Sequence, residues 1–226
     1  MNKPMASVAF ATALVAGTAL VSNSASAATV FFNSLPPTST LDGRDNVTPP
    51  FGPIYASFST DLGTYNQLQV QLLLQGSNTD AGGVRVSLLS DNSTAPGSVL
   101  TTIGTISDAQ LTGGLATLSL TTSYSLAATT RYWVELSDLN STNTSATWSY
   151  TSNTSGVGVP GEFFTNDDKL IAFPNSTNRP YQMEVSGSVS ATPLPSTWLM
   201  LLTGFVGFGF LAYRGTKKGP AAFAAV

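Results

Sequence analysis

The side chains of this 226-residue chain that could do chemistry are carboxylates and aromatic rings, because the sequence contains no cysteine and no histidine. This composition excludes a thiol nucleophile, a Ser-His-Asp triad and zinc sites built from Cys or His. Two carboxylates could still hydrolyse a glycosidic bond by acid/base catalysis. The available carboxylates are Glu135, Glu162, Asp167, Asp168 and Glu184. Because no spacing fixes the distance between any two of them, we expect no catalytic residue and no enzyme activity.

Three aromatic side chains are candidate glycan contacts. Alternate residues of a strand share a face, so Trp133 should lie beside Glu135, and Trp148 beside Tyr150. A ring next to a carboxylate is an arrangement that can stack and hold a sugar. The same rings would also suit the interior between two sheets, because aromatic residues are enriched in strands. Trp133, Trp148 and Tyr150 are therefore the candidate contacts if the protein is a carbohydrate-binding module.

Two oxygen-rich segments, residues 42–46 and 166–168, contain the side chains that calcium prefers. Neither has the spacing of a known calcium loop, and turns rich in Asn and Asp also form for backbone reasons. We therefore predict no metal and no cofactor.

Residues 28–190 have the apolar periodicity of strands. Period-two alternation recurs along this body and predicts about eight to ten strands with one buried face each. The residues that alternate are Leu68, Val70, Leu72 and Leu74; Val84, Val86 and Leu88; Ala116, Leu118 and Leu120; Tyr132, Val134 and Leu136; and Tyr181, Met183 and Val185. Turn residues separate these runs. The predicted fold is all-β: a single antiparallel β-sandwich of jelly-roll type.

The charge of the body excludes one class of partner. Residues 28–190 hold all 12 acidic residues but only five of the nine basic ones, and charged residues make up just 9% of the chain. An acidic surface of this kind does not attract phosphates, so we expect no nucleic-acid partner.

The first 27 residues have the layout of a secretory signal peptide. Lys3 gives a basic start, residues 6–21 are apolar, and Ala25 and Ala27 occupy the small-residue positions of a cleavage site. We place cleavage after Ala27, with Ala28 as the alternative. The body is therefore predicted to be exported.

Residues 191–226 form a second targeting segment. An uncharged apolar block predicts a transmembrane helix over about residues 197–213, followed by a basic end at 214–218. Arg214, Lys217 and Lys218 would stop the helix and keep this end in the cytoplasm. A buried core helix is the alternative, because the uncharged block is short for a span.

A short motif stands directly before this helix: Pro193, Leu194, Pro195, Ser196, Thr197 and Trp198. Two prolines favour an extended backbone that an enzyme can reach. The motif, helix and basic end resemble the PEP-CTERM sorting signal of Gram-negative bacteria, although Leu194 replaces the glutamate and residues 219–226 extend beyond the usual end. The resemblance implies cleavage by a membrane enzyme of the exosortase type. The Gram-positive LPxTG sortase signal is a rival, but Trp198 replaces its glycine.

The body also resembles the choice-of-anchor R domain of exported bacterial proteins. The similar segments are residues 56–60, 84–92, 96–97, 126–136 and 146–150. This resemblance implies a surface protein without enzyme activity or an established ligand.

Together these features predict an exported, non-enzymatic protein of the cell surface or extracellular matrix. It would be anchored in the inner membrane through its C-terminal helix and then processed by an exosortase-type enzyme. Its partners would be the membrane, that enzyme and exopolysaccharide. The alternatives are a carbohydrate-binding module of the matrix and a two-carboxylate glycoside hydrolase.

Overall fold

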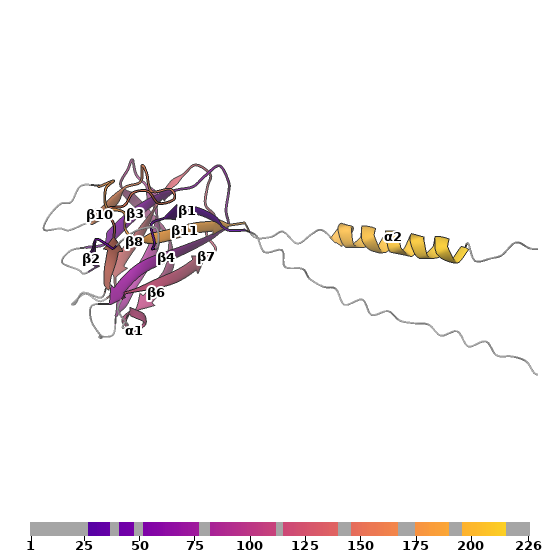
Figure 1. Ribbon diagram of the computed structural model, residues 1–226, viewed down its shortest axis with the longest axis horizontal. Coiled ribbons are helices and arrows are strands. Elements are labelled where there is room, and N and C mark those ends of the chain that lie inside the picture. The colour runs from indigo at the N-terminus through magenta and orange to yellow at the C-terminus, as the bar shows by residue number, and fades with distance from the viewer. Residues whose placement is uncertain are drawn as a thin grey trace, which may run out of the picture. The chain divides into compact units, whose positions relative to one another are not determined.

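The alternating apolar residues of the body form strands, as the computed structural model of the chain shows (Figure 1). The structure describes residues 27–36, 41–47, 52–76, 82–111, 115–139, 146–166, 175–189 and 196–215. Residues Ser26–Ser190 make one compact unit, and the C-terminal helix belongs to another.

Eleven strands lie within the described part of the body. They are β1 (Thr29–Asn33), β2 (Gly43–Val47), β3 (Ile54–Ser59), β4 (Gln67–Gly76), β5 (Gly83–Asp91), β6 (Pro96–Ser107), β7 (Leu115–Thr122), β8 (Arg131–Asp138), β9 (Ala146–Tyr150), β10 (Phe164–Asn166) and β11 (Met183–Ser188).

The strands form two antiparallel sheets. The six-stranded sheet has the order β1-β11-β4-β9-β2, and β7 also pairs with β4. The five-stranded sheet has the order β10-β3-β8-β5-β6. Strands β2 and β10 therefore each end a sheet, and this position matters for the site described below.

The two sheets share one hydrophobic core. Leu68, Val70, Leu72 and Leu74 of β4 are fully buried, while glutamines occupy several of the positions between them. The same core contains the buried alternate residues of β5, β8 and β11. The prediction of an all-β, antiparallel fold is confirmed, but the described strands form two sheets, and the single sandwich of jelly-roll type is not shown.

Two helices complete the described elements. Helix α1 (Asp108–Leu111) is a single turn after β6, and helix α2 (Ser196–Gly215) covers the residues where the sequence predicts a C-terminal helix. Over the ranges that the structure describes, no helix combines the length and the apolar character that crossing a membrane requires, so the predicted transmembrane helix is not found there.

Candidate functional site

A cavity of about 370 Å³ opens at the edge of the body, and both β2 and β10 contribute to its lining. These two strands lie at the same end of the body in Figure 1. On one side, a strand at the edge of a sheet has no neighbouring strand, so its backbone N–H and C=O groups there can stay accessible. We call this space the edge cavity; its lining residues are Asp45, Phe164, Thr165, Asn166, Ser176, Arg179 and Tyr181.

One wall of the edge cavity is a hydrogen-bonded phenol and carboxylate. The Tyr181 hydroxyl donates to Asp45 Oδ2 over 2.6 Å, and the Tyr181 ring stacks on Trp148 with ring centroids 4.8 Å apart. Burial raises the pKa of Tyr181 well above 10, and the charge and hydrogen bond of Asp45 raise it further. The phenol is therefore a donor at neutral pH. A carboxylate has about four lone-pair sites, so Asp45 can accept further hydrogen bonds from a ligand.

The positive charge of the cavity is Arg179. This exposed side chain places its guanidinium carbon 5.5 Å from the centroid of the Tyr150 ring. The Tyr150 phenol packs against Gly43, where a Cβ would overlap it. Arg179 makes no ion pair with any described residue. Its five N–H donors are thus held by a cation-π contact and are not neutralised by any carboxylate that the structure describes.

Uncharged polar side chains complete the lining. Strand β10 supplies Thr165 and Asn166, and Ser176 is held in place by two backbone hydrogen bonds of 2.8 Å with Phe164. The Asn166 Oδ1 atom is buried without a hydrogen-bond partner. A buried polar atom without a partner costs about 1–3 kcal/mol. Because this atom has almost no exposed surface, a ligand in the cavity could pair with it only after the Asn166 amide rotates.

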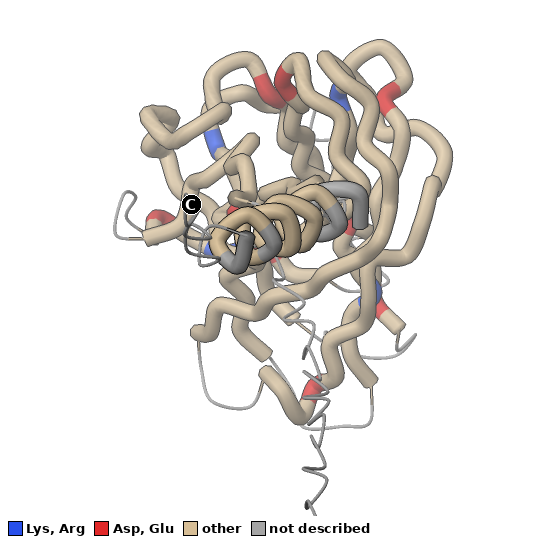
Figure 2. The backbone as a smooth tube through the Cα atoms, turned by 90° about the vertical axis from the view of Figure 1, so that its right-hand side faces the viewer, with Lys and Arg blue, Asp and Glu red and all other residues tan. Residues whose placement is uncertain are grey.

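The described lining of the edge cavity carries two charges of opposite sign, on Asp45 and Arg179. Elsewhere on the body, charged residues are few and scattered (Figure 2). In the described ranges no three acidic side chains converge to hold a metal ion. The described lining holds one carboxylate, that of Asp45, which can take part in hydrogen bonds with a ligand.

Two of the three predicted glycan contacts are wrong. Trp133 and Trp148 have no exposed surface. Trp148 belongs to the core and donates its Nε1–H to the Gln182 carbonyl over 3.1 Å. Trp133 lies outside the core cluster, as alternation predicts, but it is covered and donates to Asp91 over 2.8 Å. Tyr150 is half-buried and supports Arg179 from behind the cavity.

Glu162 has a structural role. Glu162 is buried, accepts hydrogen bonds from the hydroxyls of Ser57 and Ser59, and forms an ion pair with Arg131 at 3.3 Å. Neither Glu162 nor Glu135 lines the edge cavity. The structure therefore does not bring these two candidates together in the cavity.

Of the other acidic candidates, one lies in the described part of the body and two do not. Glu184 accepts hydrogen bonds from Asn33 over 2.8 Å and from Gln71 over 3.2 Å. Asp167 and Asp168 lie outside the described residues.

Sequence reasoning missed the residues that make the cavity. Asp45 and Asn166 belong to the two oxygen-rich segments, and the structure brings these together although they are far apart in the chain. Arg179 and Tyr181 lie just before β11, and the sequence did not indicate that either belongs to a site. The only hint was that basic residues such as Arg179 are scarce in the body. Residues 43–47 form strand β2 rather than the loop that the sequence suggested.

The targeting residues are only partly described. Ala27 is exposed two residues before β1, and α2 begins at Ser196, contains Thr197, Trp198 and Arg214, and ends at Gly215. The remaining predicted positions, Ala25, Pro193, Leu194, Pro195, Lys217 and Lys218, lie outside the described residues.

Comparison with known proteins gives no relative: no model of a known family matches the chain, and no curated protein of similar sequence is found. The resemblances to the PEP-CTERM signal and to the choice-of-anchor R domain therefore stay predictions.

Proposed function

We propose that the chain is an exported, non-enzymatic protein of the cell surface or extracellular matrix. Its C-terminal segment anchors the precursor in the inner membrane until an exosortase-type enzyme cuts near residues 193–198. The order of the sequence features supports this proposal, because a proline motif, an apolar block and a basic end follow one another without interruption.

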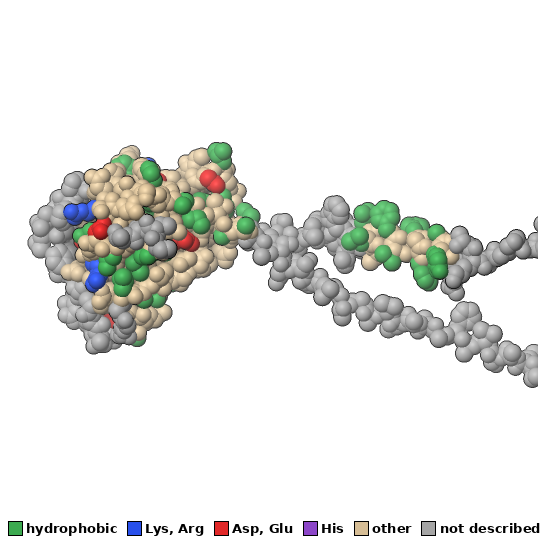
Figure 3. Space-filling model, viewed as in Figure 1, with side chains coloured by type: hydrophobic (Ala, Val, Ile, Leu, Met, Phe, Trp, Pro, Cys, Tyr) green, Lys and Arg blue, Asp and Glu red, His purple; other side chains and the backbone are tan. Residues whose placement is uncertain are grey.

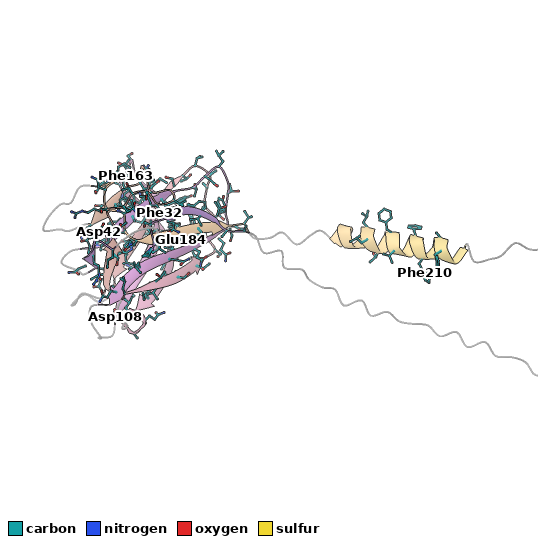
Figure 4. The ribbon with its side chains drawn as sticks, in the orientation of Figure 1. Phe32, Asp42, Asp108, Phe163, Glu184 and Phe210 are labelled. Carbon is teal, nitrogen blue, oxygen red and sulfur yellow. The ribbon has the colours of Figure 1, made fainter. Side chains whose placement is uncertain are left out.

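The observation that carries the proposal is the surface of α2. Apolar side chains of this helix are between 53% and 75% exposed, and Phe210 projects from it in Figure 4. Green apolar side chains are also prominent on α2 in Figure 3. The exposed residues are Leu201, Leu202, Phe205, Val206, Phe208, Phe210 and Tyr213. At 100° per residue these positions span about 200° of the helix circumference, with Gly204 and Gly207 on the remaining side, so the apolar face is wider than the stripe of about 100° on an ordinary surface helix.

Lipid is the medium that the flanking residues favour. Arg214 follows the last exposed aromatic residue, and a cationic end of this kind stays on the cytoplasmic side. The signal peptide would carry the body across the membrane, so that the helix alone remains associated with lipid.

Cell fractionation tests this proposal. The full-length gene is expressed in Gram-negative cells with and without an exosortase, and the protein is followed by intact mass and alkaline carbonate extraction. We expect a precursor that resists extraction in cells without the enzyme, and a shorter, released body in cells that have it. A tail of the same size and location in both cells would contradict the proposal.

Substitutions in the motif separate processing from general effects on export. Trp198→Ala and Pro195→Ala should accumulate precursor, because both alter the segment that the enzyme reads. Pro160→Ala changes an exposed proline of the body and is the matched control. Precursor accumulation in the control alone would show that the motif has no role.

A further inference from the structure

The edge cavity is a built site that the proposed function does not use. Its size lies in the lower part of the range of ligand pockets, about 300–1,000 Å³. Residues from three separate parts of the chain meet in it: β2, β10 and the segment before β11. Such convergence of polar groups at an opening is typical of ligand sites.

We propose that the edge cavity binds a neutral, hydroxyl-rich ligand, namely one sugar ring of a polysaccharide, through Asp45, Arg179, Tyr181 and Asn166. This inference concerns the body alone and does not depend on how the tail is anchored or cut.

The mixture of donors and acceptors selects hydroxyl groups. Asp45 only accepts and Arg179 only donates, and the buried oxygen of Asn166 also accepts. A sugar hydroxyl donates and accepts at once, so neighbouring hydroxyls of one ring can satisfy an acid and a guanidinium together. After a rotation of the Asn166 amide, a hydroxyl could also supply the donor that its oxygen lacks.

The same residues disfavour other ligand classes. An inorganic anion would offer acceptors only and would meet the Asp45 carboxylate. Among the described lining residues, a metal ion would find one carboxylate and a guanidinium rather than a cluster of acids. An apolar ligand would leave the polar wall without hydrogen bonds, which costs about 1–3 kcal/mol for each buried group.

The site is also held in a fixed shape before any ligand arrives. Tyr181 is clamped between its hydrogen bond to Asp45 and the ring of Trp148. Arg179 lies on Tyr150, whose position depends on the absence of a side chain at Gly43. Preorganised donors lose less entropy on binding, so they contribute more affinity.

Saccharide binding by the full chain tests the inference. The protein is purified in a detergent without a sugar headgroup, because a glucoside or maltoside would itself be a ligand. Glucose, galactose, mannose, N-acetylglucosamine and their β-linked oligosaccharides are titrated as neutral probes by saturation-transfer NMR and calorimetry. Glucuronate and inorganic sulfate are the anionic comparisons. We expect at least one neutral saccharide to bind and sulfate not to bind.

Matched variants locate the binding. Tyr181→Phe removes one hydroxyl and keeps the stacked ring, and Arg179→Ala removes an exposed side chain without a core contact. Arg179→Ala should weaken saccharide binding at least about tenfold, the effect of losing one hydrogen bond to a charged group. Tyr181→Phe removes the bond that holds the Asp45 carboxylate in place, so it should also weaken binding. Tyr65→Phe removes a similar phenol–carboxylate bond, to Asp61 over 2.9 Å, outside the edge cavity, and Arg85→Ala removes another exposed arginine. Both controls should retain binding within about twofold of wild type.

Three results would overturn the inference. The first is no binding of any neutral saccharide by the folded wild-type chain. The second is binding that survives both Tyr181→Phe and Arg179→Ala. The third is binding of glucuronate or sulfate alone, because the ligand class would then be anionic. Arg179 is exposed, so its variant remains informative if Tyr181→Phe fails to fold. Failure here with normal processing of the tail would leave the proposed export and anchoring intact.

Discussion

Replacement of Glu162 by alanine should destabilise the body strongly. This buried carboxylate ties the residues before β10 to the outer face of the five-stranded sheet. Two hydroxyls, from Ser57 and Ser59, donate to it, and Arg131 approaches it with Nε at 3.3 Å. Arg131 also donates to the Gly161 carbonyl over 3.3 Å. Without the carboxylate, the two hydroxyls and the guanidinium lose a shared acceptor.

The size of the effect follows from these contacts. A hydrogen bond to a charged group contributes about 1.5–3 kcal/mol, and breaking a buried ion pair costs about 3–5 kcal/mol. The Arg131 side chain is 25% exposed, so water replaces part of its loss. We therefore expect Glu162→Ala to lower the free energy of unfolding by about 3 kcal/mol. In a domain of this size the melting temperature should fall by about 6–12 °C.

Urea unfolding of the full chain, followed by near-ultraviolet circular dichroism, measures this change. Glu135→Ala is the matched control, because Glu135 is a half-buried glutamate on neighbouring strand β8; it should change the free energy by no more than about 0.5 kcal/mol. The double variant Glu162→Ala/Arg131→Ala should be less destabilised than the two single changes predict, by about 1–2 kcal/mol. Two results would refute this role of Glu162. One is an equal loss of stability in Glu162→Ala and Glu135→Ala. The other is strict additivity of Glu162→Ala with Arg131→Ala.

Two further predictions concern the Tyr181 phenol of the edge cavity and the glycines of the segment 158–161, which packs on β1. The pKa of Tyr181 is raised in the folded protein, so its stabilising effect is complete below the unfolded value of about 10 and is lost as the pH rises towards the folded value. Tyr181→Phe should therefore flatten the fall in unfolding free energy above about pH 10; an unchanged slope in urea titrations would contradict this assignment. Gly158 and Gly161 have φ values of +70° and +87°, but only at Gly158 would a Cβ meet the backbone, at the Phe31 carbonyl. Gly161→Ala should lower the free energy of unfolding by about 1 kcal/mol and Gly158→Ala by at least about 2 kcal/mol. Equal losses in the two variants would show that the close contact between residue 158 and β1 does not affect stability.

The core was predictable because alternation reports which face of a strand is apolar. Val70 and Leu72 of β4 and Val134 of β8 are buried as their spacing predicts. Alternation also placed Trp133 correctly on the other face of β8. It could not show that this face is covered, because covering depends on residues distant in sequence. Ser57, the cross-strand neighbour of Trp133, is contacted by Glu162, which lies 105 positions further along the chain.

The edge cavity could not be predicted for the same reason. The Tyr181 hydroxyl and the Asp45 carboxylate are 136 positions apart, and only the strand order brings them together. The sequence marked Trp148 and Tyr150 as glycan contacts, whereas the structure places them behind Tyr181 and Arg179. Aromatic residues are conspicuous in a sequence, but short polar side chains at the ends of edge strands are not.

The cavity and the point where the chain leaves the sheet lie at opposite ends of the last strand. Tyr181 of the edge cavity stands at the start of the segment that continues as β11, and the chain leaves this sheet after Ser188. An extended strand advances about 3.3 Å per residue, so about 23 Å of strand separates the cavity from the point where the tail begins. Thr29 of β1 pairs with Gly187 at that same end. Cleavage after Ala27 and within 193–198 would therefore trim both ends of the chain outside the paired strands, and the cavity would remain intact in the released body.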